Sequence, residues 1–400
     1  MFDQLYTCRG VIARHCSGPL LIERLAFLAH LRDQGYIPNG LREKARDLLA
    51  ISRMIGLASR PRKTMTLNEV KRKTANRRCL FPLAVRWLRF MRRLQQRLDP
   101  LSPCEKKIKA FADYMKREAE LSPVTIYQRC WWTKRFFESL HTRGDSLHKV
   151  TPHRIDVAFQ KMLKSGSYSR MTIRAFAHSL RAFFRLAEAR GWCRKGLAAS
   201  IQAPRVYSHA SLPQGPSWED VRRLLATTEG DQRHNIRARP MLLLLAIYGL
   251  RAGEVGRLRI EDFDWEHEVF RVKSSKTGRV RTYPLTRSVG DAILRYLKEV
   301  RPQSSHRELF LSWNPPFRPV RRPLGKLVRR RLRSLNVSLP HCGPHALRHA
   351  CATRLLAAGL SLKEIGDQLG HQNPESTRIY AKVDLAGLRE VADFDLGGVL

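Results

Sequence analysis

Three times near the middle of this chain, a short hydroxyl side chain is followed at once by proline. The pairs are Ser102-Pro103, Ser122-Pro123 and Thr151-Pro152. Each pair is typical of a helix start, because the hydroxyl accepts a hydrogen bond from a free backbone N–H group and proline suits the first helical position. Apolar residues at helical spacing follow each pair, and a fourth amphipathic stretch covers about residues 170–190. Residues 103–200 are therefore predicted to form a four-helix domain.

The rest of the 400 residues divides around this block. Residues 1–100 are basic, with apolar positions at helical spacing, and their polar stretch 60–78 favours a loop. Residues 201–216 contain three prolines and few apolar side chains, which is typical of a linker. Within residues 217–400, alternating apolar positions around 263–285 predict a small antiparallel sheet. The predicted fold class is mainly α with a small antiparallel β-sheet, in more than one domain.

The charge of the chain limits the partners that it can have. It carries 74 lysines and arginines against 35 acidic residues, a formal net charge of +39. A field of that sign attracts polyanions, and nucleic acid above all. A nucleic-acid partner is therefore predicted, although composition alone also leaves open a ribosome-like basic protein or one that binds a membrane surface.

Several features favour a reducing, cytoplasmic compartment. Eight cysteines are scattered without a Cys-x-x-Cys pair, so neither a disulfide framework nor a zinc site is expected. The start MFDQLYTCRG lacks the layout of a signal peptide. The longest apolar run, residues 241–248, is far shorter than the roughly 20 residues that cross a bilayer, and it predicts a buried helix. We expect no cofactor, no metal and no membrane partner.

The last third of the chain carries side chains suited to phosphodiester chemistry. In chain order they are Arg251, Lys276, His345, Arg348, His371 and Tyr380. A guanidinium group can donate two parallel hydrogen bonds to phosphate oxygens, and a histidine can exchange a proton near neutral pH. Each residue alone also fits an ordinary role, such as a solvated turn lysine, a helix-capping histidine or an interface tyrosine. The presence of the whole set favours a site that holds a phosphodiester and attacks it without a metal.

The local sequences around these residues are GLRAGE, SSKTGR, HALRH, LGH and IYAKV. In order and context they resemble the active-site boxes of the tyrosine recombinases, the phage-integrase family. The resemblance covers about 300 residues from position 103 onward, and it is most specific along PHALRHACATRLL. It implies a SAM-like, DNA-binding core-binding domain at 103–200 and a catalytic domain with its C-terminal tail at 217–400.

The resemblance also implies roles for the reacting groups. Tyr380 is expected to be the nucleophile that forms a 3′-phosphotyrosyl bond, on a helix that begins at Asn373-Pro374. His345 is expected to take the tyrosine proton, because an unperturbed phenol has a pKa near roughly 10 and needs help to ionise. Lys276, at the tip of the predicted hairpin, is expected to protonate the departing 5′ oxygen.

The remaining members of the set are expected to act on the phosphate. Arg251 and Arg348, together with His371, are expected to stabilise the negative charge that gathers on the non-bridging oxygens during attack. Glu254 follows Arg251 by three residues, and the resemblance implies that this carboxylate orients the site without being its acid or base.

The expected function is site-specific recombination or integration of double-stranded DNA, for a mobile genetic element in a bacterial, nucleoid-associated setting. By the resemblance, the enzyme acts on DNA as a homo- or hetero-tetramer in which residues 381–400 dock on a neighbouring protomer, and other recombinases can take part. Two alternatives stay open: a DNA-binding accessory protein that does not cut, and a type IB topoisomerase. The role of residues 1–100 is open as well, between binding of further DNA sites and assembly.

Overall fold

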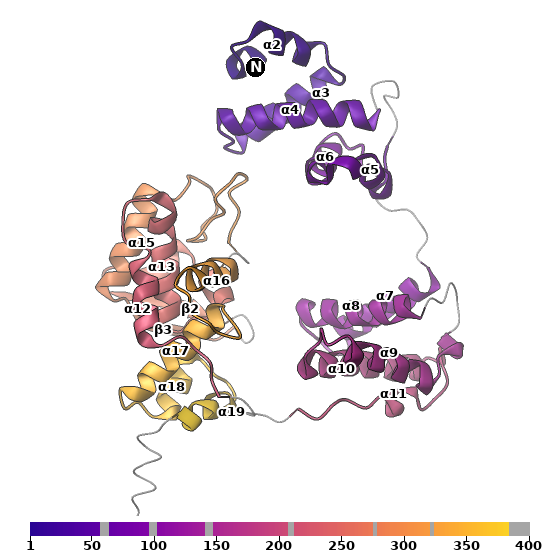
Figure 1. The fold of residues 1–400 in the computed structure, drawn as a ribbon, viewed down its shortest axis with the longest axis vertical. Coiled ribbons are helices and arrows are strands. Elements are labelled where there is room, and N and C mark those ends of the chain that lie inside the picture. Colours follow the sequence, from indigo (N-terminus) through magenta and orange to yellow (C-terminus); the bar gives the residue numbers. More distant parts are fainter. Residues whose placement is uncertain are drawn as a thin grey trace, which may run out of the picture. The chain divides into compact units, whose positions relative to one another are not determined.

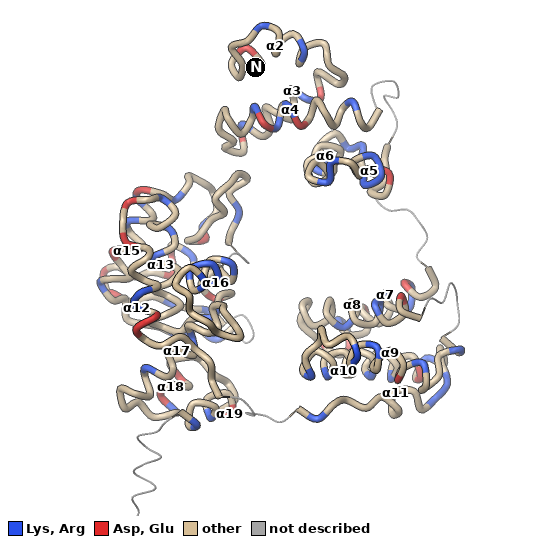
Figure 2. Tube along the Cα trace, in the orientation of Figure 1, with Lys and Arg blue, Asp and Glu red and all other residues tan. Residues whose placement is uncertain are grey.

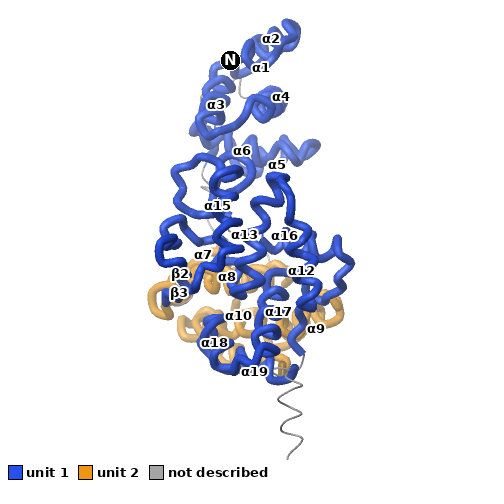
Figure 3. Tube along the Cα trace, turned by 90° about the vertical axis from the view of Figure 1, so that its left-hand side faces the viewer, with its two compact units in different colours: residues 1–95, 211–400 blue, residues 96–210 orange. Residues whose placement is uncertain are grey.

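The computed structural model describes residues 1–56, 64–95, 102–140, 147–206, 212–274, 278–320 and 324–383. Their contacts define two compact units, residues 1–95 with 211–400 and residues 96–210 (Figure 3). Helices dominate both units, and the described part of the first unit also holds a three-stranded antiparallel sheet. The predicted fold class, mainly α with a small antiparallel β-sheet, is confirmed. Within these ranges, every helix is too short or too polar to cross a membrane.

The N-terminal part of the first unit is helical (Figure 1). Its elements are α1 (Phe2–Leu5), α2 (Arg9–Cys16), α3 (Leu21–Asp33), α4 (Pro38–Ile55), α5 (Leu67–Lys73), the 3₁₀ helix η1 (Ala75–Leu80) and α6 (Phe81–Phe90). They share one apolar core, in which Leu28 of α3 and Trp87 of α6 are fully buried. The loop predicted at 60–78 is wrong for residues 67–78, because a capping box at Thr66 starts α5 and η1 follows it.

The second unit contains the predicted helical block. Its elements are α7 (Pro103–Arg117), α8 (Pro123–Ser139), the 3₁₀ helix η2 (Leu147–Lys149), α9 (Pro152–Lys164), α10 (Arg170–Ala189) and α11 (Leu197–Ser200). The predicted helix starts are confirmed, since the side chains of Ser102, Ser122 and Thr151 each accept a hydrogen bond from the backbone N–H three residues further on. The sequence pattern did not indicate η2 or α11.

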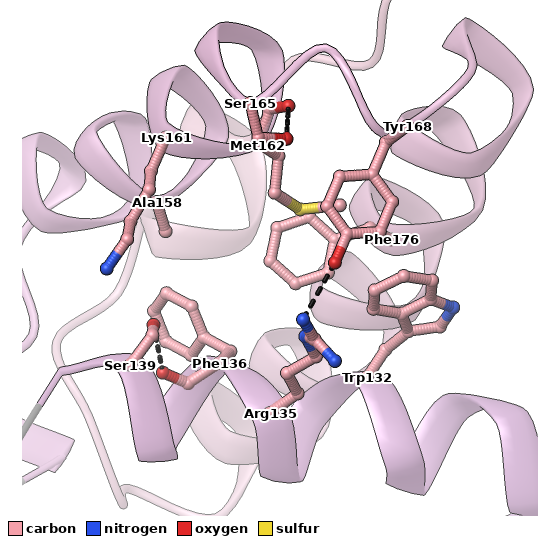
Figure 4. Close-up of a pocket in the computed structure, with 10 residues that line it drawn as sticks. All are labelled: Trp132, Arg135, Phe136, Ser139, Ala158, Lys161, Met162, Ser165, Tyr168 and Phe176. Atoms are coloured by element: carbon pink, nitrogen blue, oxygen red, sulfur yellow. Dashed lines mark hydrogen bonds between the residues drawn. The ribbon is translucent and has the colours of Figure 1, made fainter.

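A small cavity opens between α8, α9 and the start of α10 (Figure 4). It has a volume of about 260 Å³, and Phe136 and Phe176 are among the side chains that line it. Arg135 donates a hydrogen bond of 2.7 Å to the hydroxyl of Tyr168 beside it. The cavity therefore combines an aromatic lining with a cationic edge, because Lys161 lines it as well.

The C-terminal part of the first unit contains the sheet and the remaining helices. In order they are α12 (Trp218–Ala226), α13 (Arg233–Ile247), α14 (Ala252–Val255), η3 (Ile260–Asp262), β1 (Phe263–Asp264), β2 (Val269–Lys273), β3 (Val280–Pro284), α15 (Arg287–Glu299), α16 (Leu324–Ser334), α17 (Pro344–Ala357), α18 (Leu362–Leu369), α19 (Glu375–Arg378) and η4 (Ile379–Val383). The strands lie in the order β1-β2-β3, with Phe270 opposite Tyr283. The apolar run 241–248 lies mainly in the last turns of α13, and it is buried as predicted. Because α13 packs against both α15 and α17, this core fixes the chain that leads into α14.

Candidate active site

Arg251 lies immediately after the buried helix α13, at the residue that caps α14. Its Nη1 donates to Oε1 of Glu254 at 3.1 Å, and its backbone N–H donates to Oε2 of the same carboxylate at 2.9 Å. Its Nη2 donates to the carbonyl of Gly370 at 3.2 Å. The side chain of Glu254 is 1% exposed, whereas that of Arg251 is 37% exposed. The guanidinium is thus anchored from the protein side and still reaches solvent.

A further arginine, which the sequence analysis did not select, completes this arrangement. Arg281 lies on β3, and its Nη2 is 3.0 Å from Oε1 of Glu254. That contact is within ion-pair distance without the geometry of a hydrogen bond, and Nη2 has no acceptor among the described residues. Its Nη1 donates to the carbonyl of Gln368 at 3.2 Å and to the hydroxyl of Tyr283. One carboxylate therefore lies between two guanidinium groups, which leaves a net positive charge.

Arg348 connects three segments that are far apart in the sequence. It lies on α17 with 2% of its surface exposed, and its Nη1 and Nη2 donate to the carbonyls of Gly249 and Leu369 at 2.6 and 2.7 Å. Burial, followed by the charge of Arg251, lowers the pKa of Arg348 to about 10, so the group stays protonated at neutral pH. A guanidinium group has five N–H donors, so these two hydrogen bonds do not use all of them.

His345 lies in the first turn of α17 with its side chain exposed. Desolvation by the surrounding protein, followed by the charges of Arg348 and Arg251, lowers the pKa of His345 below its ordinary value. Its ring packs edge-on against that of His349, with 4.9 Å between the centroids. A neutral imidazole at this position can accept a proton, which is what its predicted role requires.

The side chain next to the hydroxyl of Tyr380 is His349, which the sequence analysis did not select. The two are joined by a hydrogen bond of 3.0 Å between Nδ1 and the hydroxyl oxygen. Tyr380 is 1% exposed and lies on the 3₁₀ helix η4, which follows α19 directly, so the helix predicted from Asn373-Pro374 is divided into a short α-helix and a 3₁₀ helix. Burial raises the pKa of Tyr380 to about 12, although the charge of Arg348 acts in the opposite direction.

The pKa shifts of the two groups indicate that both are neutral. Burial, with the charges of His345 and Arg348, lowers the pKa of His349 to about 4. The lowered pKa of His349 and the raised pKa of Tyr380 both oppose transfer of the proton from the phenol to this imidazole. The phenol is therefore protonated and the imidazole neutral, and the tautomer of His349 decides which of the two donates. His349 positions the hydroxyl and does not ionise it in this conformation.

His371 follows Gly370, whose φ of 66° ends α18 in the left-handed region. Its Nδ1 is 2.7 Å from the hydroxyl oxygen of Thr377. Burial and the charges of Arg348 and Arg251 lower the pKa of His371 to about 4. His371 is thus a neutral imidazole at the same cluster of arginines. Lys276 and residues 384–400 of the tail lie outside the described residues.

The structure thus gathers the described members of the predicted set around α13, α17 and the end of α18. Three of them, Arg251, Arg348 and His371, meet at the carbonyls and the turn around Gly370. The nucleophile candidate lies within the electrostatic reach of Arg348. Such a net-positive cluster, with donors held by the backbone and a phenol beside it, is suited to bind and attack a phosphodiester.

Family comparisons agree with this geometry. Residues 217–386 match the model of the phage integrase family, and residues 108–191 match that of the phage integrase N-terminal SAM-like domain. An integrase/recombinase of Sinorhizobium fredii is 35% identical over 294 residues, covering 73% of this chain and 71% of the relative. Tyrosine recombinase XerA of Pyrococcus horikoshii is 28% identical over 291 residues, covering 72% of this chain and 92% of the relative.

Solved structures show the same fold. The XerH site-specific recombinase bound to its palindromic difH substrate has a TM-score of 0.55 at 20% identity, covering 71% of this chain and 84% of that chain. The Tn1549 transposon integrase in complex with circular intermediate DNA has a TM-score of 0.52 at 23% identity, covering 72% and 99%. The fold is that of a recombinase catalytic domain with a SAM-like helical domain. The chain belongs to the phage integrase family, the tyrosine recombinases.

Proposed function

We propose that this protein cuts and rejoins duplex DNA at specific sites, with Tyr380 as the nucleophile. The observation that carries the proposal is the hydroxyl of Tyr380 held by His349, where the charge of the buried Arg348 acts on it. Arg251 and Arg281, paired to Glu254, supply two further cations. These donors are in place before any substrate arrives, which is the condition for stabilising charge as it develops.

The reaction conserves the phosphate bond energy. The oxygen of Tyr380 attacks the phosphorus of a DNA phosphodiester, a 3′-phosphotyrosyl bond forms, and the bond to the 5′ oxygen breaks. The departing 5′ oxygen takes a proton from Lys276, and a 5′ hydroxyl of another strand reverses the step. Negative charge gathers on the non-bridging oxygens during attack, where Arg251 and Arg348 stabilise it. Loss of one such donor typically costs about 3–4 kcal/mol of transition-state stabilisation.

Tyr380 must lose its hydroxyl proton before or during attack on phosphorus. His345 is our proposed acceptor, because its exposed, neutral ring lies in the first turn of α17 and packs on His349. His349 is a positioning residue, since it holds the hydroxyl oxygen at one place while the phenol stays protonated. His371 is held by Thr377 in an orientation from which its ring can donate to the phosphate.

Affinity for DNA comes from charge spread over many elements (Figure 2). On α16, the exposed face carries Lys326, Arg329, Arg330 and Arg333, while Val328 and Leu332 are buried. Such a basic face binds phosphates without regard to sequence. We assign residues 103–200 as the core-binding domain and 217–400 as the catalytic domain, joined by a linker at 201–216. Assembly as a tetramer through residues 381–400 is part of the same proposal.

The test is capture of the covalent intermediate. A pool of nicked duplexes with randomised arms is incubated with the full chain, and adducts that survive denaturation are separated and sequenced. The wild type is expected to form the adduct and Tyr380→Phe is expected to form none. Tyr127→Phe is the matched control, because Tyr127 is 69% exposed on α8 and should react as the wild type does. An adduct formed equally well by Tyr380→Phe would refute the assignment of the nucleophile.

One observation favours a second candidate, a DNA-binding protein that does not cut. Tyr380 is 1% exposed and its pKa is raised to about 12, which is a poor state for a nucleophile. A wild type that shifts the selected duplexes on a native gel but forms no adduct from nicked versions of them would support this candidate. Relaxation of supercoiled plasmid by the monomer would instead indicate a type IB topoisomerase.

A further inference from the structure

The end of the linker, residues 212–216, passes across α17, the helix that carries several of the candidate active-site residues. The closest approach is at Gly215. A Cβ atom added to Gly215 would be 2.8 Å from the backbone nitrogen of Ala350 and 2.9 Å from the carbonyl oxygen of Ala346. Both of these atoms belong to the helix backbone, so they cannot rotate away as the end of a flexible side chain can.

Space, and not backbone conformation, is what requires glycine at this position. The φ of Gly215 lies outside the left-handed region, unlike the φ values of Gly249 and Gly370 in the same unit. Other residue types could therefore adopt the backbone conformation of Gly215. An alanine there would be strained only by its contact with α17. Gly215 thus marks a close contact between two backbones.

The chain that follows Gly215 is anchored on the same helix. Pro216 is buried, and Ser217 caps α12 with its hydroxyl. The ring of Trp218 packs against the guanidinium of Arg354 on α17, with 3.9 Å between Cζ and the ring centroid. Because α12 as a whole also packs against α17, moving the linker alone would not make room for a side chain at position 215. The backbone of α17 would have to shift as well.

The third neighbour of Gly215 belongs to the candidate active site. A Cβ atom at position 215 would be 3.2 Å from the Cβ of His349. From that Cβ, the imidazole reaches Tyr380, with 3.0 Å between Nδ1 and the hydroxyl oxygen. A shift of the His349 Cβ away from the linker would be passed on to its ring. The hydrogen bond would then weaken, because its strength depends on distance and angle.

We propose that Gly215 is a positioning residue of the active site. Because Gly215 has no side chain, the linker can lie on α17 at the distance that places His349, and His349 in turn holds the hydroxyl of Tyr380. Gly215 acts through His349 and not on the substrate. This inference deepens the proposed function and rests on it, since it takes Tyr380 as the nucleophile.

The first experiment measures the rate of adduct formation by the full chain on one nicked duplex selected with the wild type. Gly215→Ala should slow this rate about tenfold, as expected for the loss of one positioned hydrogen bond. The affinity for the duplex should stay within about twofold of the wild-type value, because no charge is removed. A rate for Gly215→Ala equal to that of the wild type would overturn the inference.

Gly290→Ala is the matched control for this change. Gly290 is buried on α15 in the same unit, and the nearest atoms would lie at an ordinary contact distance of 3.7 Å from its added Cβ. The control therefore adds the same methyl group to a buried glycine without a clash. It should form the adduct as fast as the wild type does.

The second experiment asks whether Gly215 acts through the imidazole. His349→Ala keeps the Cβ that a side chain at position 215 would meet, so the steric contact is the same in both backgrounds. In the His349→Ala background, Gly215→Ala should change the rate by less than about twofold. A merely structural role would give the same factor in both backgrounds, and the double variant would fall about a hundredfold below the wild type. That multiplication of the two effects would overturn the inference.

The third measurement does not depend on cleavage. 3-Fluorotyrosine is incorporated into the full chain, and the fluorine NMR resonance of Tyr380 is identified by its loss in Tyr380→Phe. This resonance should move in Gly215→Ala in the direction seen for His349→Ala, and it should stay in place in Gly290→Ala. A wild type that forms no adduct would refute the proposed function, while the moved resonance would still support the contact. An unmoved resonance with normal adduct formation would refute the positioning role alone.

A further variant applies if the clash unfolds the chain, which would appear as collapse of all the tyrosine resonances of Gly215→Ala. Trp218→Leu loosens the end of the linker from Arg354 without adding a clash. It should slow adduct formation about threefold, since about one cation–π contact no longer holds the linker on α17. A rate and a Tyr380 resonance identical to those of the wild type would overturn the inference in that case.

Discussion

The carboxylate of Glu254 should contribute more to the free energy of unfolding than any surface charge in this protein, and the variant Glu254→Gln tests this. Its side chain is 1% exposed between Arg251 at 3.1 Å and Arg281 at 3.0 Å. With the centres of the delocalised charges about 4 Å apart and an effective dielectric constant of about 20, each contact is worth roughly 4 kcal/mol, and the two together roughly 8 kcal/mol. The neutral amide no longer has to be desolvated as an anion, which returns several kcal/mol. A net loss of about 3 kcal/mol in the free energy of unfolding follows.

The free energy of unfolding has to be measured for the core around Glu254 alone, because the chain contains two compact units. Urea-dependent hydrogen exchange in peptides from 241–264 does so. Glu299→Gln is the matched control, since Glu299 is half exposed and its ion pair with Arg295 should contribute less than about 1 kcal/mol. The double variant Glu254→Gln/Arg281→Gln should recover part of the loss, because the amide then faces a single guanidinium. Equal, small losses for Glu254→Gln and Glu299→Gln would refute the reasoning.

Three further predictions concern the same site. His349→Ala removes the hydrogen-bond partner of the Tyr380 hydroxyl and should slow adduct formation about tenfold. His349→Asn, with an amide that can hydrogen-bond near the place of Nδ1, should restore most of the rate. The pKa of His371 is lowered to about 4, so its neutral form contributes stability that is fully present above pH 6.5 and is lost as the pH falls towards 4. After allowance for solvent screening, this contribution is on the order of 2 kcal/mol. The urea midpoint of His371→Gln should therefore depend less on pH than that of the wild type. Gly370→Ala puts a Cβ 2.5 Å from the guanidinium carbon of Arg281 on β3 and should lower the melting temperature. Gly359→Ala is the control and should lower it less, because the φ of Gly359 is also positive but its Cβ would meet nothing within 4 Å. Equal melting temperatures for the two alanine variants would contradict the crowding argument.

Much of the fold could be predicted from local chemistry. The hydroxyl-proline pairs start α7, α8 and α9, and the alternation around 263–285 forms the sheet. The incorrect prediction of a loop within 60–78 arose from the basic composition of this stretch, although Thr66 and Glu69, three residues apart, form the pattern of a capping box. The predicted domain boundaries stay predictions.

The site was only partly readable, for a physical reason. Arg251 and Arg348 are charged residues beside apolar runs, and this can be recognised from the sequence alone. Arg281 and His349 act through partners that are 27 and 31 residues away along the chain, and only packing reveals them. Arg281 can be singled out from the sequence as a basic residue within a strand, but its pairing with Glu254 depends on how β3 lies relative to α14.

Arg348 shows why loss of activity and loss of structure are hard to separate in this protein. Its two short hydrogen bonds satisfy the carbonyls of Gly249 and Leu369, and truncation would leave both acceptors unpaired in the interior. Each orphaned acceptor costs about 1–3 kcal/mol. Arg348→Ala is therefore a poor control for a folded but catalytically inactive enzyme, because the abundance of the variant in cells would fall along with its activity. Tyr380→Phe keeps the ring and gives up one hydroxyl, so it is the better reagent for separating chemistry from folding.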